Sequence, residues 1–252
     1  MVELSHALPE ISGLQLSARG SGGGKSVVAK LHGAYLGSAF QAWRSPCDGE
    51  VLAYEAYARS HSKHGENLSP WQLFAEVEVD DQLVTLDRLC RTVHALNYFA
   101  VGDPGQPLVL NVDARLLHCV PDRHGEFFSR VLGLLDVAPQ RIVIDIRTSQ
   151  LIDLSRLRRV IGNYRRHGFQ VAVNAEGVMH ARSLANLLMP DVLMLEADVL
   201  HPKALANMKS ALAKDGVRVA VKRIETSDQL AVARDAGVDW VQGFLLDLPT
   251  TG

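Results

Sequence analysis

Residues 169–222 read FQVAVNAEGVMHARSLANLLMPDVLMLEADVLHPKALANMKSALAKDGVRVAVK. Three short apolar runs in this stretch, at 169–174, 191–196 and 217–222, alternate with two longer stretches in which apolar residues lie three and four positions apart. Short apolar runs are typical of buried strands, and the longer period is that of helices. This alternation predicts parallel strands that are connected by helices.

The same alternation extends beyond this stretch in both directions. Further short apolar runs occur at 107–112, 141–146 and 240–244. Glycine favours the left-handed backbone at helix ends, and it stands where helices should stop, at Gly168, Gly216 and Gly237. From residue 107 onward, the chain is therefore expected to form a repeated strand–helix fold.

Polar residues lie at or near the ends of almost all these apolar runs: Asn111, Asp145, Asn174, Glu196, Lys222 and Gln242. In a parallel α/β barrel, the carboxyl ends of the strands converge on one face, where functional sites lie. These side chains are thus predicted to line one mouth of the barrel. Hydrated loops also favour polar strand ends, and the repeat alone does not decide between the two explanations.

The N-terminal part of the chain differs from this repeat. We expect residues 1–37 to form a flexible arm, because they are rich in Gly and Ser, and residues 38–252 to form the barrel domain. The segment 24–26, Gly-Lys-Ser, resembles the end of a P-loop, but Arg19 stands where that motif needs glycine. A hairpin turn at 45–49 and an amphipathic helix over 80–98 are predicted next.

Composition excludes several classes of function. With a formal net charge of -2 and no long basic run, the chain shows no footprint of nucleic-acid binding. It has no run of 18 apolar residues and no signal-peptide pattern, so we expect no membrane span and a cytoplasmic location. Cys47, Cys90 and Cys119 are too widely spaced for a zinc site, and His61 and His64 have no third ligand nearby in the sequence.

Several segments resemble, in order, the motifs of the EAL domain family of cyclic di-GMP signalling, over about residues 39–249. Glu55-Ala56-Tyr57 stands in place of the EAL signature, and the ending AGVDWVQGFLLDLP at 236–249 is similar to the family's GxDxxQGYxxxxP. Other matching segments are LNV at 110–112, VIDIRTS at 143–149, NAEG at 174–177, PDVLMLE at 190–196 and AVKRIET at 220–226. The resemblance implies an α/β fold, the modified TIM-like (β/α) barrel of the EAL type, as a stand-alone domain.

Active members of this family hydrolyse cyclic di-GMP with two divalent metal ions. The resemblance assigns the metal-ligand positions to Glu55, Asn111, Asp145, Asn174, Ala175 and Lys222. Hard divalent cations need an anionic oxygen shell, whereas an ammonium about 4 Å away repels them by several kcal/mol at an effective dielectric near 20. Met194 also replaces the lysine that contacts the attacking water. We therefore expect degenerate catalytic positions at Asn174, Ala175, Met194 and Lys222, with no catalytic residue, bound metal or cofactor.

The resemblance also implies a candidate set of residues that bind cyclic di-GMP without metal: Gln41, Glu55, Tyr57, Arg59, Asn111, Asp145 and Gln242. Arg59 stands where the family's arginine meets a phosphate, which a guanidinium can bind through two hydrogen bonds. Arg59 could equally pair with Glu55. Lys222 is predicted to pair with Glu55 or Asp145 in an internal salt bridge that keeps the mouth in shape without metal.

Three functions remain open from the sequence. The first is a regulator that senses cyclic di-GMP or binds a protein partner. The second is a pure protein-interaction module, with Trp71, Leu73 and Phe74 as a weak candidate anchor, because such residues more often pack in cores. The third is a phosphodiesterase with a metal site rebuilt from Glu176 and Glu196. A homodimer is implied by the resemblance only.

Overall fold

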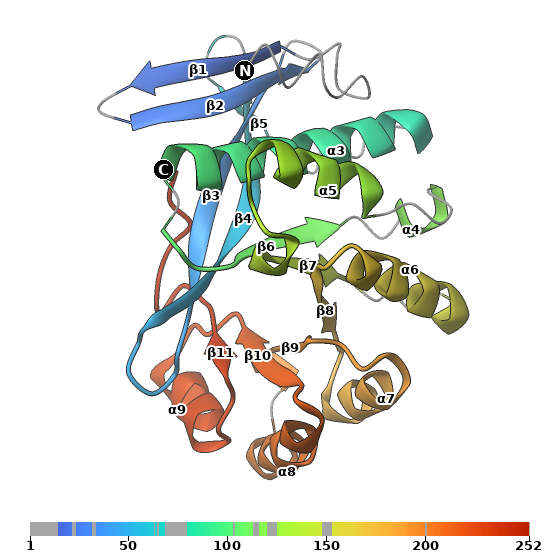
Figure 1. Ribbon diagram of the computed structural model, residues 1–252. Helices are drawn as coiled ribbons and strands as arrows, with labels where there is room; N and C mark the ends of the chain where they lie inside the picture. The colour runs from blue at the N-terminus through green and yellow to red at the C-terminus, as the bar shows by residue number, and fades with distance from the viewer. Residues whose placement is uncertain are drawn as a thin grey trace.

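The computed structural model describes residues 15–21, 24–31, 34–62, 64, 66–68, 80–102, 104–112, 116–119, 125–147, 153–199 and 201–251. Within these residues, eight strands close into a barrel. Figure 1 labels each of them. They are β3 (Ala34–Arg44), β4 (Val51–Ser62), β6 (Leu108–Val112), β7 (Ile142–Ile146), β8 (Gln170–Asn174), β9 (Val192–Glu196), β10 (Arg218–Lys222) and β11 (Trp240–Val241).

The barrel is a modified TIM-like barrel because one strand runs against the others. Strand β4 and strands β6 to β11 run parallel to one another around the ring. Strand β3 is antiparallel to both β4 and β11, and it closes the ring between them. The predicted fold class, an α/β barrel with a hairpin turn before the repeat, is confirmed: the β3–β4 turn spans residues 45–50.

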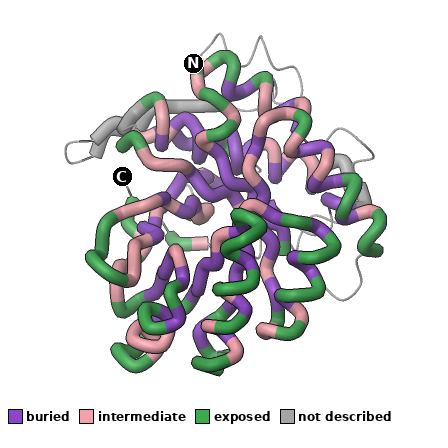
Figure 2. Tube along the Cα trace, turned by 60° about the horizontal axis from the view of Figure 1, so that its bottom comes forward, coloured by how far each residue is buried: buried purple, intermediate pink, exposed green. Residues whose placement is uncertain are grey.

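Helices cover the outside of this barrel. The regular ones are α3 (Asp80–Ala95), α4 (Leu116–Cys119), α5 (Glu126–Leu134), α6 (Leu154–Arg166), α7 (Val178–Leu188), α8 (Pro202–Leu212) and α9 (Ser227–Asp235). Shorter helical turns are η2 (Leu96–Gly102), η3 (Pro139–Arg141), η4 (Ala197–Val199) and η5 (Ala213–Asp215). Figure 2 shows buried strands at the centre and exposed outer faces on the helices around them. This layering is the one that a repeated βα pattern produces.

The predicted strands and helix ends agree closely with the structure. Strands β6 to β10 each begin one residue after the predicted run and end at the predicted residue. Gly168, Gly216 and Gly237 have positive φ values of 86°, 69° and 71°. The run predicted at 240–244 is a strand only at 240–241, because the chain turns at Gly243 against Ile224. A Cβ on Gly243 would lie 2.1 Å from the Ile224 carbonyl oxygen.

The expectation of a flexible arm over residues 1–37 is wrong for its described part. Strands β1 (Gln15–Ser21) and β2 (Gly24–Leu31) form an antiparallel hairpin that extends the sheet from β3. The physical reason is the apolar run 27–29, which is buried; Ala29 packs with Leu36 and with residues of α3. The high Gly and Ser content of this segment predicts a flexible arm, and the apolar run is too short to change that prediction. Residues 1–14 lie outside the described residues.

The barrel interior is filled by one apolar layer below the mouth. Its members come from alternate positions of the eight strands: Trp43, Ala53, Val109, Val143, Ala172, Val192, Met194, Ala220 and Trp240. Because strand side chains alternate with a period of two, inward-facing residues two positions further along β4, β6, β7, β8 and β10 stand above this layer.

Within the described part of the chain, no helix has both the length and the apolarity to cross a bilayer.

Candidate functional site

Lys222, the last residue of β10, lies between two carboxylates at the barrel mouth. Its ammonium donates a hydrogen bond to Asp145 Oδ2 at 2.6 Å, and it lies 3.7 Å from Glu55 Oε1. Glu55 and Asp145 are 1% and 0% exposed. The internal salt bridge predicted for Lys222 is therefore confirmed, with Asp145 as the closer partner.

The surroundings of Lys222 keep it charged. Burial is the largest single influence and lowers the pKa of Lys222, but the negative charges of Asp145 and Glu55 more than offset it, so the pKa is raised. The ammonium also lies 5.8 Å from the centre of the Trp43 ring, in a cation–π arrangement. A positive charge is thus fixed at the centre of the mouth at neutral pH.

Two amides complete this cluster. Asn111 Nδ2, from β6, donates to Glu55 Oε1 at 2.9 Å. Asn174 Nδ2, from β8, donates to Asp145 Oδ1. Each buried acid therefore receives one hydrogen bond from an amide and attraction from the lysine, and these contacts offset part of the cost of burying a carboxylate. We call Glu55, Asn111, Asp145, Asn174 and Lys222 the mouth cluster.

Tyr57 and Gln242 form a second polar contact at the mouth. The Tyr57 hydroxyl donates to Gln242 Oε1 at 3.1 Å. Burial raises the pKa of Tyr57, and the charge of Glu55 raises it further, so the hydroxyl remains a donor at physiological pH. Gln41 is buried, but its amide donates to the Asp247 carbonyl oxygen at 2.7 Å, so that donor is occupied by the C-terminal segment.

Arg59 is exposed, and its contacts are local. Its Nη1 donates to the Ala58 carbonyl oxygen at 3.0 Å, and its guanidinium carbon lies 5.9 Å from the centre of the Tyr57 ring. In the described part of the chain, no ion pair joins Arg59 to Glu55. The structure therefore does not bring those two residues together, and the guanidinium remains accessible to solvent.

Two of the positions that we expected to be degenerate, Ala175 and Met194, have side chains without an oxygen atom. Ala175 is buried, and its backbone N donates to the Met194 carbonyl oxygen at 2.8 Å. Met194 is 0% exposed and belongs to the apolar layer inside the barrel. Glu196 is exposed instead and forms an ion pair with Arg223, with 3.1 Å between Arg223 Nη1 and Glu196 Oε2.

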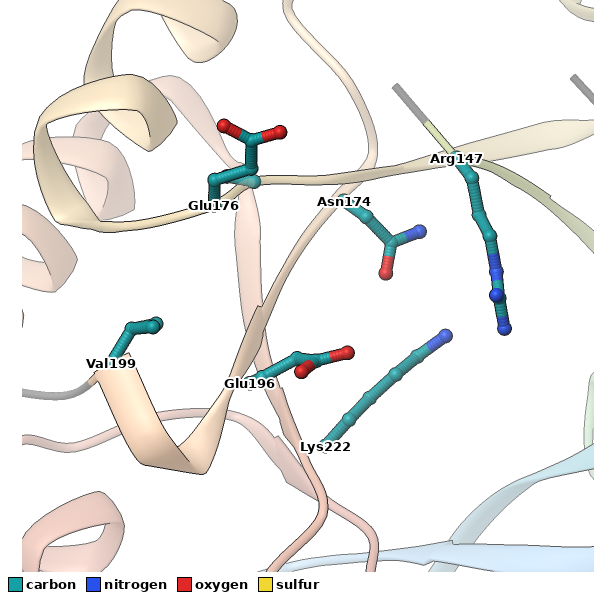
Figure 3. A pocket seen from close by; sticks show the side chains of 7 residues that line it. Arg147, Asn174, Glu176, Glu196, Val199 and Lys222 are labelled. Carbon is teal, nitrogen blue, oxygen red and sulfur yellow. The ribbon is translucent and has the colours of Figure 1, made fainter. Parts of the chain in front are cut away.

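A cavity of about 360 Å³ opens at this mouth. Figure 3 shows the side chains around it: Arg147, Asn174, Glu176, Glu196, Val199 and Lys222 are labelled, and Ala175 completes the lining. Its size falls within the range of small-molecule pockets. The sequence prediction missed Arg147 and Arg223. Arg147 could have been found because it directly follows an apolar strand, and Arg223 because it follows Lys222.

The residues present do not fit a pair of divalent metal ions. The Lys222 ammonium is within hydrogen-bond distance of Asp145, and Ala175 supplies no oxygen. In the part of the chain that the structure describes, no group of three or more His, Cys, Asp or Glu side chains could hold a metal ion. His61 stacks on Tyr35 with 5.4 Å between the ring centres.

The family assignment rests on comparison with known domains. The EAL domain model matches residues 27–249. The chain belongs to the EAL domain family. The match begins inside β2, so in this EAL domain the hairpin is partly included in the region that the family shares. A search of the curated proteins found no significant match.

Solved EAL structures are similar in fold. The YkuI protein of Bacillus subtilis, in complex with substrate c-di-GMP and calcium, is 25% identical, with a TM-score of 0.70 over 86% of this chain and 56% of that one. BlrP1 of Klebsiella pneumoniae, in a calcium and c-di-GMP complex, is 21% identical, with a TM-score of 0.73 over 85% and 56%. This EAL domain therefore spans little more than half of either chain.

A stand-alone EAL protein of Vibrio cholerae, in its c-di-GMP bound form, is similar over most of its length. It is 17% identical, with a TM-score of 0.71 over 85% of this chain and 92% of that one. At this identity, the likeness shows the fold alone.

The other sequence candidates at the rim, Trp71, Leu73 and Phe74, lie outside the described residues.

Proposed function

We propose that this EAL domain is a catalytically inactive regulator of cyclic di-GMP signalling that senses the dinucleotide without metal, binds a protein partner, or does both. The observation that carries the proposal is the ion pair of Lys222 with Asp145, at 2.6 Å, beside Glu55. A side-chain cation already lies beside the two carboxylates that would otherwise attract a metal ion. Hydrolysis by two metal ions needs both ions in place.

Electrostatics supports a catalytically inactive domain rather than a domain with a rebuilt metal site. A metal ion at Asp145 would have to displace the Lys222 ammonium or lie a few ångströms from it, where like charges repel by several kcal/mol. Glu176 and Glu196, the carboxylates from which a metal site could be rebuilt, are poorly placed for it. Glu196 is paired with Arg223, and the carboxylate of Glu176 points away from Lys222 in Figure 3. No catalytic step is therefore assigned to the mouth.

Binding of cyclic di-GMP is supported by the shape of the mouth and by its likeness to dinucleotide-bound structures. A cavity of about 360 Å³ remains open above the mouth cluster. Arg59 stays exposed next to Tyr57, where a phosphate could approach it from solvent. The lysine and the two amides hold the mouth cluster in place, so the recognition surface is formed without metal.

Exposed apolar side chains favour the second candidate, a module that binds a protein partner. Met179 and Phe244 are 78% and 64% exposed, and they follow β8 and β11 on the mouth side of the barrel. Val199, which lines the cavity, is 41% exposed. Large apolar side chains that remain exposed on one face are a common feature of protein-interaction sites. In this alternative, the domain would bind its partner without the dinucleotide.

Calorimetric titration with cyclic di-GMP tests the proposal directly. The purified protein is titrated once with a chelator and once with Mg²⁺ or Mn²⁺, and both samples are then analysed for linear dinucleotide. We expect the same affinity in both conditions and no linear product. Absence of binding in both would favour the pure interaction module, whereas metal-dependent product would overturn the inactive reading.

A further inference from the structure

Arg147 is the last described residue before the loop that follows β7, and its side chain lines the cavity. It is exposed, and its positive charge is close enough to Tyr57 and Lys222 to oppose slightly the rise in the pKa of both groups. Among the described residues, no hydrogen-bond acceptor or carboxylate pairs with the Arg147 guanidinium. In Figure 3 the guanidinium extends toward the side of the cavity where the ammonium of Lys222 lies.

The neighbouring cations are already paired. Lys222 donates to Asp145, and Arg223 pairs with Glu196. Arg223 also keeps a left-handed backbone, with φ of 60°, which disfavours a non-glycine residue. Arg147 therefore differs from both: its donors face the cavity without a protein acceptor in the described part of the chain. A guanidinium has five N–H donors, and their planar arrangement matches phosphate oxygens.

Charge balance at the mouth also depends on Arg147. The two buried acids, Glu55 and Asp145, carry two negative charges, and Lys222 supplies only one positive charge. The positive charge of Arg147 brings these four groups to neutrality. Without it, an approaching anion would meet a net negative centre. Glu176 also lines the cavity, but its carboxylate points away from Arg147 and Lys222 in Figure 3.

We propose that Arg147 is the phosphate-contacting cation of this mouth, and that it binds one phosphodiester group of a cyclic dinucleotide while Lys222 remains paired with Asp145. The proposal rests on the dinucleotide-sensing function proposed above and adds a residue to it. Arg59, on β4, is a second exposed guanidinium beside Tyr57, so the mouth has two cations for a ligand with two phosphates. Arg147 thus supplies the charge that metal ions cannot supply beside Lys222.

Affinity for cyclic di-GMP, measured by calorimetry with chelator present, tests the role of Arg147. Hydrogen bonds to charged groups contribute enough that we expect Arg147→Gln to weaken binding by about 10- to 100-fold. Arg147→Lys keeps the charge but loses the planar fork, so it should retain part of the affinity. The thermal midpoint of each variant should equal that of the wild type, because Arg147 makes no hydrogen bond within the described residues.

Arg166→Gln is the matched control. Arg166 is an exposed arginine at the C-terminal end of α6, which lies at the opposite end of the barrel from the mouth, and its replacement should leave the affinity unchanged. If wild type binds and Arg147→Gln binds equally well, the assignment of Arg147 is overturned while dinucleotide sensing stands. If the wild type itself does not bind, dinucleotide sensing and the role of Arg147 fall together, and protein-partner binding is left as the function. Equal losses of affinity in Arg147→Gln and Arg166→Gln would show that Arg147 acts only through the overall charge of the protein. That result would also contradict the assignment.

Discussion

Lys222 explains why two buried acids persist at a mouth that does not fit metal ions. Glu55 and Asp145 are almost completely buried, and each needs a counter-charge, because an unpaired buried carboxylate costs several kcal/mol. The lysine supplies that charge from β10, and the amides of Asn111 and Asn174 donate to Glu55 Oε1 and Asp145 Oδ1. The pairing with Lys222 therefore accounts for the presence of two buried acids at this mouth.

Replacing Lys222 with glutamate should make the stability of the protein depend on metal. Lys222→Glu places three carboxylates together, and their repulsion destabilises the folded state until a divalent cation binds. A ligand at 100 times its Kd that binds only the folded state adds about 2.7 kcal/mol. In a domain of this size, that corresponds to a rise of roughly 5–10 °C in the thermal midpoint. We expect this rise with Mn²⁺, measured by differential scanning calorimetry, and no rise for wild type.

Lys222→Met separates the loss of the charge from the gain of an oxygen ligand. Breaking a buried ion pair by removing one partner costs about 3–5 kcal/mol, so this variant should also melt earlier than wild type. Because it adds no oxygen, Mn²⁺ should not restore its thermal midpoint. An equal Mn²⁺ response in wild type and Lys222→Glu would show that the lysine does not exclude metal.

At the scale of elements, one side chain joins the β1–β2 hairpin to the helical layer. Strand β2 pairs with β3 only through residues 29–31, so the backbone of Val27 has no partner on the β3 strand. Asn97, in η2, takes that place: its Oδ1 accepts from Val27 N at 2.6 Å, and its Nδ2 donates to Val27 O at 2.9 Å. The amide thus pairs with Val27 as a neighbouring strand would.

Asn97→Leu should loosen β2 while leaving the barrel intact. The substitution leaves the buried N–H and C=O of Val27 without partners, at a cost of about 1–3 kcal/mol each. Hydrogen exchange in peptides that cover β2 should therefore be at least about 10-fold faster. Peptides from β9 serve as the internal control and should exchange at the wild-type rate. Asn97→Asp keeps the acceptor for Val27 N, so its effect should be smaller; unchanged exchange in β2 for Asn97→Leu would contradict the role of Asn97.

These elements also show how far the sequence could predict the fold. Strands β6 to β10 were predictable because buried runs of one length alternate with helical periods. The hairpin β1–β2 was missed because its apolar run 27–29 is short and lies beside glycines. The hairpin turn at 45–49 predicted that β3 is antiparallel to β4, but the closure of the ring between β3 and β11 did not follow from periodicity. It is set by packing across the whole ring, which no local pattern records.

The candidate site, like the fold, was predictable only in part. The strand-end rule correctly gathered Asn111, Asp145, Asn174 and Lys222. The lysine–carboxylate pairing followed from their charges together with the positions that the EAL resemblance assigns to them. Arg147 was missed because an arginine after a strand looks like any hydrated loop residue. Its significance depends on which neighbouring charges are already paired, and that is a property of the folded mouth.

At the scale of the whole molecule, a buried histidine links stability to pH. His94, on α3, is 5% exposed, and its Nδ1 lies 2.7 Å from Ser38 Oγ of β3. Burial lowers the pKa of His94 to about 3, and the positive charge of Arg59 acts in the same direction. The folded protein therefore keeps this imidazole neutral, whereas the unfolded chain protonates it near its ordinary pKa of about 6.5.

Acid should therefore weaken the fold through His94. Between pH 6.5 and pH 3 the unfolded chain binds one more proton here than the folded chain, so the stabilisation is complete above pH 6.5 and is lost as pH falls towards 3. We expect wild type to lose about 1 kcal/mol more per pH unit than His94→Gln below pH 6, by urea unfolding at several pH values. His201→Gln, at an exposed histidine, should keep the wild-type slope. Parallel curves for wild type and His94→Gln would mean that the folded protein protonates His94 as readily as the unfolded chain does, so its burial would not oppose the charge.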